Sequence, residues 1–138
     1  MGSNGFVIIM KDWNILKYKY SNLFYNKFFG FECDDGWYDL IEELLSKIQF
    51  FDVKISQIKS KFGGLRVYVL TNDSFVNRII EFYEEKAKKT CEYCGNRGFI
   101  VNERWIAVLC NSCYYKKYFK NTKKCYKFHN DECYNICA

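Results

Sequence analysis

Four cysteines in two C-x-x-C pairs have the spacing of a metal site. The pairs read C-E-Y-C and C-N-S-C, with fifteen residues between them. Four thiolates at this spacing can close a tetrahedron around one Zn²⁺, and a shell of four sulfurs leaves no position for water or substrate. The sequence therefore predicts a structural zinc site, with two disulfides as the alternative that a reducing compartment disfavours. The predicted ligands are Cys91, Cys94, Cys110 and Cys113.

A second group of ligand-type residues recurs at every fourth position near the C-terminus. The group consists of Cys125, His129, Cys133 and Cys137. On one straight helix these four would spread over about 18 Å, so they reach a single metal only if the segment folds back near Asn130. Three hypotheses stay open: a second metal site, a metal that Cys125 and His129 share with Cys33, and a disulfide formed on oxidation.

The segment 59–66 reads K-S-K-F-G-G-L-R and could hold an anion. Consecutive glycines let a backbone approach a phosphate closely, while lysine supplies charge and arginine adds a bidentate fork. A tryptophan beside the acidic pair at 34–35 could flank the ligand. The alternative is that Gly-Gly serves only as a hairpin turn, since the segment lacks the spacing of a P-loop or dinucleotide motif. The predicted ligand-binding residues are Lys61, Gly63, Gly64, Arg66 and Trp37.

Positive charge is concentrated in the C-terminal third of the chain. Residues 91–138 contain 8 Lys and Arg against 4 Asp and Glu, whereas residues 1–90 contain 13 against 12. Aromatic residues alternate with these lysines, and such a mixture could contact phosphates and stack on the bases of single strands. A solvated lysine face over an aromatic core is the alternative. This nucleic-acid interpretation rests on Lys116, Lys117, Lys120, Lys123 and Lys124.

Candidate catalytic groups are sparse in this sequence. The chain has one histidine, and no Ser or Cys nucleophile lies in a recognised motif. The acids between Asp34 and Glu43 could in principle hold Mg²⁺, but their place at the start of an expected helix is explained by capping and the helix dipole. We therefore expect no enzyme activity and no catalytic residue.

The hydrophobic pattern predicts an α+β protein whose elements position these residues. The expected elements of the main part are a helix over 11–29, a helix over 37–48 capped by Asp34 or Asp35, strands over 53–61 and 65–70 joined at 62–64, and a helix over 75–87 capped within 72–74. Between the cysteine pairs we expect a hairpin from 99–101 and 105–109, and after them a helix over 114–120. Knuckle, hairpin, knuckle and helix is the order of a treble-clef zinc finger.

Four parts make up the predicted domain organisation. They are residues 1–10 as an added or disordered N-terminal segment, 11–90 as a small helix and β-hairpin main domain, 91–121 as the four-Cys zinc module, and 122–138 as the Cys/His-containing tail. The apolar run 6–10 is too short for a signal sequence or a membrane helix. We expect a cytoplasmic protein with no membrane partner.

An ordered set of motifs resembles a family of small, largely uncharacterised phage and prophage accessory proteins. The motifs are GWYDLI at 36–41, KFGGLR at 61–66, CEYCG at 91–95, RWI at 104–106 and LC at 109–110. The resemblance covers about residues 30–115. The chain departs from the family in a shorter segment between the first long helix and the strands, and in the extension after Cys113. The resemblance implies a viral origin, and hence the cytoplasm of an infected bacterium, but no reaction.

The expected function is that of a non-enzymatic, zinc-stabilised accessory protein. It would bind a small anionic, nucleotide-like ligand and so sequester a signal used in host defence. The alternatives are a nucleic-acid-binding zinc-finger protein and an adaptor that inhibits a host protein through an aromatic surface. We favour the small ligand because the net charge is only +5 over 138 residues and the Gly-Gly segment lies in the main domain. The expected cofactor is Zn²⁺ at one site, with a second site left open.

Overall fold

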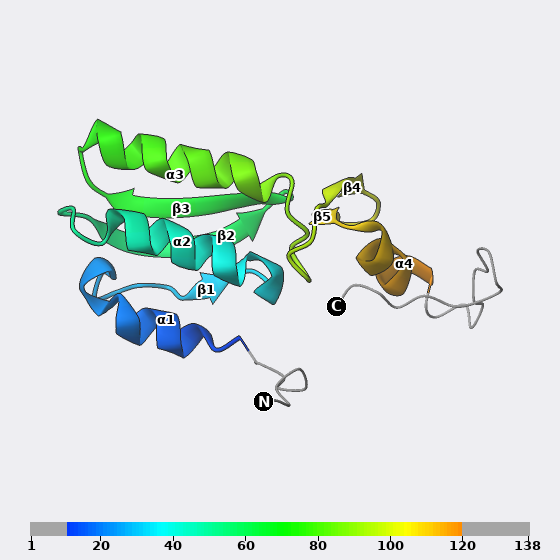
Figure 1. Cartoon of the computed structure of the whole chain (residues 1–138), viewed down its shortest axis with the longest axis horizontal. Helices are drawn as coiled ribbons and strands as arrows, with labels where there is room; N and C mark the ends of the chain where they lie inside the picture. Colours follow the sequence, from blue (N-terminus) through cyan, green and yellow to red (C-terminus); the bar gives the residue numbers. More distant parts are fainter. Residues whose placement is uncertain (1–10, 120–138) are drawn as a thin grey trace, which may run out of the picture.

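A three-stranded sheet lies at the centre of the larger part of the chain. The computed structural model describes residues 11–119 as a mixed α/β structure with small sheets (Figure 1). The strand order is β1-β2-β3, with β1 parallel and β3 antiparallel to β2. The elements are α1 (Trp13–Lys19), η2 (Ser21–Leu23), β1 (Phe31–Glu32), η3 (Asp35–Trp37), α2 (Tyr38–Ile48), β2 (Lys54–Lys61), β3 (Gly64–Leu70), α3 (Ser74–Ala87), β4 (Phe99–Asn102), β5 (Ile106–Leu109) and α4 (Asn111–Phe119), where η denotes a 3₁₀ helix.

The hairpin between β2 and β3 turns at Phe62 and Gly63. Their φ angles are 53° and 77°, so both central residues of this two-residue turn are left-handed. That is the requirement of a type I′ turn, whose twist matches the twist of the flanking strands. Lys61 and Gly64 close the turn as a directly paired couple. The predicted strands and turn are confirmed to within one residue.

Three helices cover one face of this sheet. Ile58, Leu65 and Val67 alternate with exposed strand residues and are buried. Figure 1 shows α2 lying across β2, with α3 along β3 and α1 beside β1. The predicted helices over 37–48 and 75–87 are confirmed, and the Asp73 side chain caps α3 by accepting from the Phe75 N–H. The fully buried large side chains of the core include Leu16, Leu23, Trp37, Ile41, Leu44, Leu45, Ile48, Ile55 and Val76.

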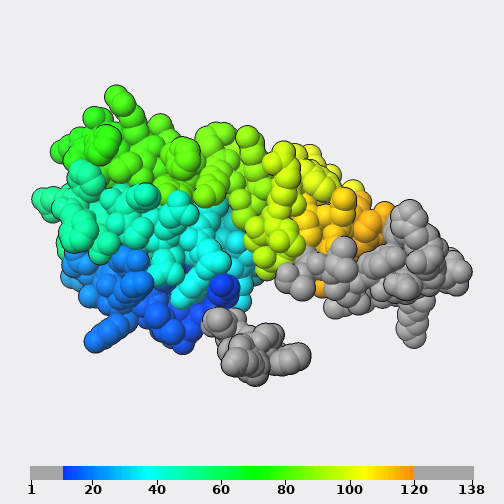
Figure 2. Space-filling view, in the orientation of Figure 1, coloured from blue at the N-terminus to red at the C-terminus, as the bar shows by residue number. Residues whose placement is uncertain are grey.

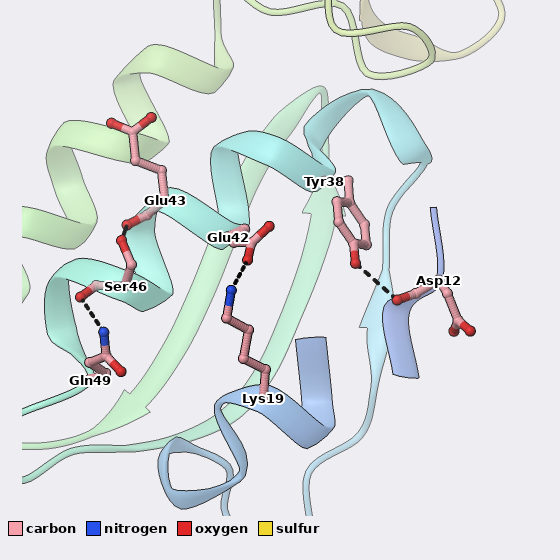
Figure 3. Close-up of polar contacts among 7 residues, drawn as sticks. All are labelled: Asp12, Lys19, Tyr38, Glu42, Glu43, Ser46 and Gln49. Carbon is pink, nitrogen blue, oxygen red and sulfur yellow. Dashed lines mark hydrogen bonds and ion pairs between the residues drawn. The ribbon is translucent and has the colours of Figure 1, made fainter. Parts of the chain in front are cut away.

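Polar contacts fix α1 against α2 (Figure 3). The ammonium of Lys19 lies 2.9 Å from a carboxylate oxygen of Glu42, and the Tyr38 hydroxyl donates to the Asp12 carbonyl at 3.0 Å. Exposed ion pairs contribute only about 0–1 kcal/mol, so apolar packing holds the two helices together. The polar contacts set the orientation in which they pack.

The expected helix over 11–29 is wrong beyond residue 19. α1 ends at Lys19, and a 3₁₀ turn leads into an extended segment. Phe24 there forms a parallel bridge with Ile55, and the Tyr25 N–H donates to the Ile55 carbonyl at 2.9 Å. The Phe29 N–H likewise donates to the Ser56 carbonyl at 3.0 Å, so β2 supplies backbone partners that a helix would otherwise provide.

The expected capping of α2 by Asp34 or Asp35 is also wrong. Neither side chain caps the helix, because η3 precedes α2 and places Trp37 at the N-cap without a side-chain bond. The Asp35 carboxylate instead accepts from the indole N–H of Trp13 at 3.0 Å. The acid at this position therefore ties α1 to the start of α2.

A second, smaller sheet follows α3. β4 and β5 pair antiparallel, and α4 begins at Asn111 inside the second cysteine pair rather than at Tyr114 as expected. One face of the hairpin contributes Val101 and Ala107 to a cluster of buried residues around the cysteines. Figure 2 shows residues 91–119, yellow to orange, continuous with the body formed by the preceding residues.

The start of α2 and the first cysteine pair are in direct backbone contact. The Gly36 N–H donates to the Glu92 carbonyl at 2.7 Å, and the indole N–H of Trp37 donates to the Thr90 carbonyl at 2.9 Å. A Cβ on Gly36 would overlap the carbonyl oxygen of Cys91 and lie 2.5 Å from the carbonyl carbon of Glu92. Only glycine lets the two backbones approach this closely.

Replacing Gly36 by alanine should therefore destabilise the whole protein. Because backbone atoms cannot yield as a flexible side chain can, we expect the free energy of unfolding to fall by about 3 kcal/mol, the upper end for overpacking. The matched control is Gly64→Ala, where the added Cβ meets no atom closer than 3.4 Å and the backbone is not left-handed. Urea denaturation measures both, and equal losses would mean that the contact at Gly36 is unimportant.

Candidate functional site

The four cysteines of the two pairs converge on one point. Their sulfur atoms all lie within 4.8 Å of one another, and the Sγ atoms of Cys94 and Cys110 are 3.7 Å apart. Tetrahedral Zn–S bonds of about 2.3 Å place neighbouring sulfurs about 3.8 Å apart. The cluster formed by Cys91, Cys94, Cys110 and Cys113 could therefore hold a metal ion, and its dimensions are compatible with one zinc.

Local backbone structure places N–H donors around the first of these thiols. The Gly95 N–H donates to the Cys91 carbonyl at 2.9 Å in a tight turn that gives Gly95 a φ of 86°. Burial by itself would raise the pKa of the Cys91 thiol, but backbone N–H groups of Cys110, Cys94 and Tyr93 donate to it and lower the pKa overall. Donors of this kind stabilise the thiolate, which is the form that binds metal.

The second group of predicted metal ligands, Cys125, His129, Cys133 and Cys137, lies outside the described residues. Cys33, its suggested partner, is a half-buried thiol between β1 and η3. Burial raises the pKa of Cys33 well above its usual range, with the charges of Glu92 and Asp34 adding to the effect. Its surroundings thus favour the neutral thiol.

The sheet has one face that no helix of residues 11–119 covers. Its side chains come from the strand positions that alternate with the core residues. Lys59 lies directly opposite Arg66, and Gln57 directly opposite Tyr68. Arg66 is exposed and Lys59 is partly exposed. We call this surface, defined by Gln57, Lys59, Lys61, Gly64, Arg66 and Tyr68, the open face.

Three of the five residues predicted to bind a ligand lie together on the open face. A Cβ on Gly64 would lie 3.4 Å from a terminal nitrogen of Arg66, so the guanidinium lies beside the position that a side chain would take. Lys61 pairs directly with Gly64 across the hairpin and is exposed. Lys61 and Arg66 therefore place two cations on either side of Gly64.

The other two predicted ligand residues have structural roles. Gly63 is buried against the second hairpin, where an added Cβ would lie 2.8 Å from Ile100 and 3.1 Å from Ile106. Trp37 has no exposed surface. The expectation that Trp37 flanks a ligand is wrong, because the indole lies inside the core and its N–H is already donated.

The predicted nucleic-acid lysines are only partly covered by the structure. Lys116 and Lys117 belong to the last turns of α4, whereas Lys120, Lys123 and Lys124 lie outside the described residues. The ammonium of Lys117 donates to the Tyr93 hydroxyl and lies 5.0 Å from the centre of that ring. Lys117 therefore joins α4 to the first cysteine pair.

The acids near the start of α2 are engaged with neighbouring side chains. Asp39 pairs with Lys11 at 3.1 Å, and Glu43 lies 3.7 Å from Lys86 and accepts from the Tyr83 hydroxyl at 2.7 Å. They line a cavity of about 420 Å³ that also contacts Gly95. Asp35 also lines this cavity and accepts from the Trp13 indole N–H, so each of the three lining carboxylates is already engaged with a neighbouring side chain.

Sequence reasoning missed Tyr68, and it placed Lys59 in the candidate segment 59–66 without naming it as a ligand residue. Both follow from the alternation of strand residues once the register of β2 and β3 is known. The alternation of apolar and polar residues carried this information, because Ile58, Leu65 and Val67 occupy the strand positions that face the core. A bulge between Ile55 and Gln57 shifts that register, which makes the facing residues hard to assign from the sequence.

No model of a known protein family matches the chain, and no curated protein or solved structure matches it. Among residues 11–119, no helix has both the length and the apolar character needed to cross a membrane. The chemistry of the residues themselves therefore carries the functional argument.

Replacing one cysteine of the cluster should remove one bound metal ion per chain. We expect Cys110→Ser to lower the metal content measured by plasma mass spectrometry by one ion and to lower the melting temperature, because metal binding and folding are coupled. Cys33→Ser is the matched control and should keep the full metal content. A loss of metal from the Cys33 variant instead would place that thiol in a metal site.

Proposed function

We propose that this chain is a non-enzymatic binding protein that holds a phosphate-bearing, nucleotide-like ligand on its open face. The observation that carries the proposal is the convergence of Lys61 and Arg66 beside Gly64. Arginine offers a planar fork for two phosphate oxygens, and lysine adds a compact charge. The missing side chain of Gly64 leaves room for an anion to approach the backbone.

The charge balance around the two cations supports an anionic ligand. Lys61 and Arg66 have no ion pair within 4.0 Å among residues 11–119. Lys59 and Arg66 lie directly opposite each other, an arrangement that is destabilising by about 0.2–1 kcal/mol for like charges. An anion bound between them would relieve this repulsion.

In this proposal the four-cysteine cluster binds one zinc in a treble-clef-like module. The order of cysteine pair, hairpin, cysteine pair and helix supports it. Four sulfur ligands leave no open position on the metal, so the zinc stabilises the fold and takes no part in chemistry. The role of the metal is to hold the hairpin β4–β5 against the turn of β2–β3.

The biological setting is the part of the proposal that rests on the motif resemblance. A small phage accessory protein with an anion-binding surface could sequester a nucleotide signal of host defence in the bacterial cytoplasm. The same resemblance covers the KFGGLR motif, which contains Lys61, Gly64 and Arg66. Sequestration requires binding alone and no reaction.

A thermal-shift series tests the proposed function. Pyrophosphate and a set of linear and cyclic nucleotides are added to the full chain, and a ligand at about 100 times its Kd stabilises the fold by about 2.7 kcal/mol. Arg66→Ala should weaken binding at least tenfold, since charge-assisted hydrogen bonds contribute about 1.5–3 kcal/mol. Arg78→Ala, at an exposed position of α3, is the matched control and should leave binding unchanged. An equal effect of both variants, or no stabilising compound, would sink the proposal.

A further inference from the structure

We infer that the ligand of the open face is an extended single strand of nucleic acid rather than a single nucleotide. This inference rests on the proposed function, because it uses the same cations. It adds two aromatic rings, at opposite ends of the face, as stacking surfaces for bases. The nucleic-acid strand would run along β2 and β3 from Tyr68 to Phe62.

The two rings lie at the ends of the cationic row. Tyr68 is 40% exposed and pairs with Gln57, while Phe62 is 73% exposed at the turn. Lys61 links Phe62 to the open face, because its ammonium lies 5.9 Å from the centre of that ring. Aromatic side chains exposed beside cations are the elements from which single-strand binding surfaces are built.

The distance between the rings exceeds the reach of one nucleotide. From Gln57, opposite Tyr68, to Phe62 is five residues along an extended strand, or about 17 Å. One base with its sugar and phosphate cannot contact both rings at once. A chain of several nucleotides can place one base on each ring and its phosphates on Lys59, Arg66 and Lys61 between them.

Two acids lie near this row and offset part of its positive charge. Glu32 is the register partner of Lys59 and accepts from the Gln57 amide at 2.6 Å. Glu84 accepts from the Val67 N–H at 3.0 Å at the edge of the sheet. Glu32 lies on the same face as Lys59, and the charge of Arg66 acts on Glu84. The three cations Lys59, Lys61 and Arg66 still outnumber these two carboxylates. The charge of the row is complementary to a phosphate backbone.

A single strand fits this surface better than a duplex does. The bases of a duplex are stacked on one another and cannot cover the rings of Tyr68 and Phe62, whereas unstacked bases can. No helix of residues 11–119 projects from the open face into a groove. The face thus offers stacking and charge without the protrusion that groove recognition requires.

Fluorescence anisotropy with the full-length protein tests this inference. The probes are a labelled 12-nucleotide oligo-dT, oligo-U of the same length, a 12-base-pair duplex and thymidine monophosphate. We expect the single strands to bind at least tenfold more tightly than the monophosphate and the duplex. With three cations in contact, log K should fall with log salt at a slope of about −2, and Arg66→Ala should reduce this slope by about 0.7.

Variants of the two rings separate stacking from charge. Tyr68→Thr keeps a strand-forming residue, and Phe62→Asn suits the left-handed turn position, so both remove a ring with little effect on the fold. Each should weaken oligo-dT binding about 5- to 160-fold. Tyr18→Ala removes a ring that is 85% exposed on α1, away from the open face, and should have no effect.

The outcomes distinguish this inference from the proposed function. If oligo-dT binds no more tightly than the monophosphate while Arg66→Ala weakens both, the extended strand is wrong and the proposed function stands. If neither pyrophosphate, nucleotides nor oligo-dT binds, both fail. Binding of oligo-dT that is unchanged by Arg66→Ala, Tyr68→Thr and Phe62→Asn would move the site away from the open face and overturn the inference.

Discussion

The contact between Gly36 and the first cysteine pair is the constraint on which the arrangement of the chain depends. It joins the start of α2 to the residues that follow α3, and it does so through backbone atoms. The indole N–H of Trp37 binds the Thr90 carbonyl beside it, and the ring itself fills the core. A single segment thus sets the position of α2 over the sheet and the position of the cysteine cluster.

The side chain of Glu92 completes this junction. It is the one polar or charged residue that is buried among residues 11–119. Its carboxylate accepts from the Ser60 hydroxyl at 3.1 Å and from the Asp34 N–H at 3.4 Å. A buried carboxylate destabilises the fold unless it has such partners. Through these hydrogen bonds, Glu92 fixes the positions of β2, the start of η3 and the first cysteine pair relative to one another.

The features that could be predicted from the sequence are those that local chemistry determines. The cysteine spacing, the left-handed turn before Gly64 and the period of α2 each follow from residues close together in the chain. The parallel pairing of Phe31 with Ile58 could not be predicted, because it brings together residues far apart in sequence. The role of Trp37 was misjudged for the same reason: its partner, the Thr90 carbonyl, lies beyond four intervening elements.

The two adjacent glycines of the β2–β3 turn are subject to different constraints. Gly63 is required because Ile100 and Ile106 of the second hairpin lie where its side chain would be, whereas the space beside Gly64 is bordered by the Arg66 guanidinium. One glycine thus faces the cysteine module and its neighbour faces the open face. Since the hairpin β4–β5 shares its buried cluster with the cysteines, a metal bound there would fix the hairpin and, through Gly63, the turn that carries Phe62. The metal site and the proposed ligand surface are therefore mechanically connected through a turn of two residues.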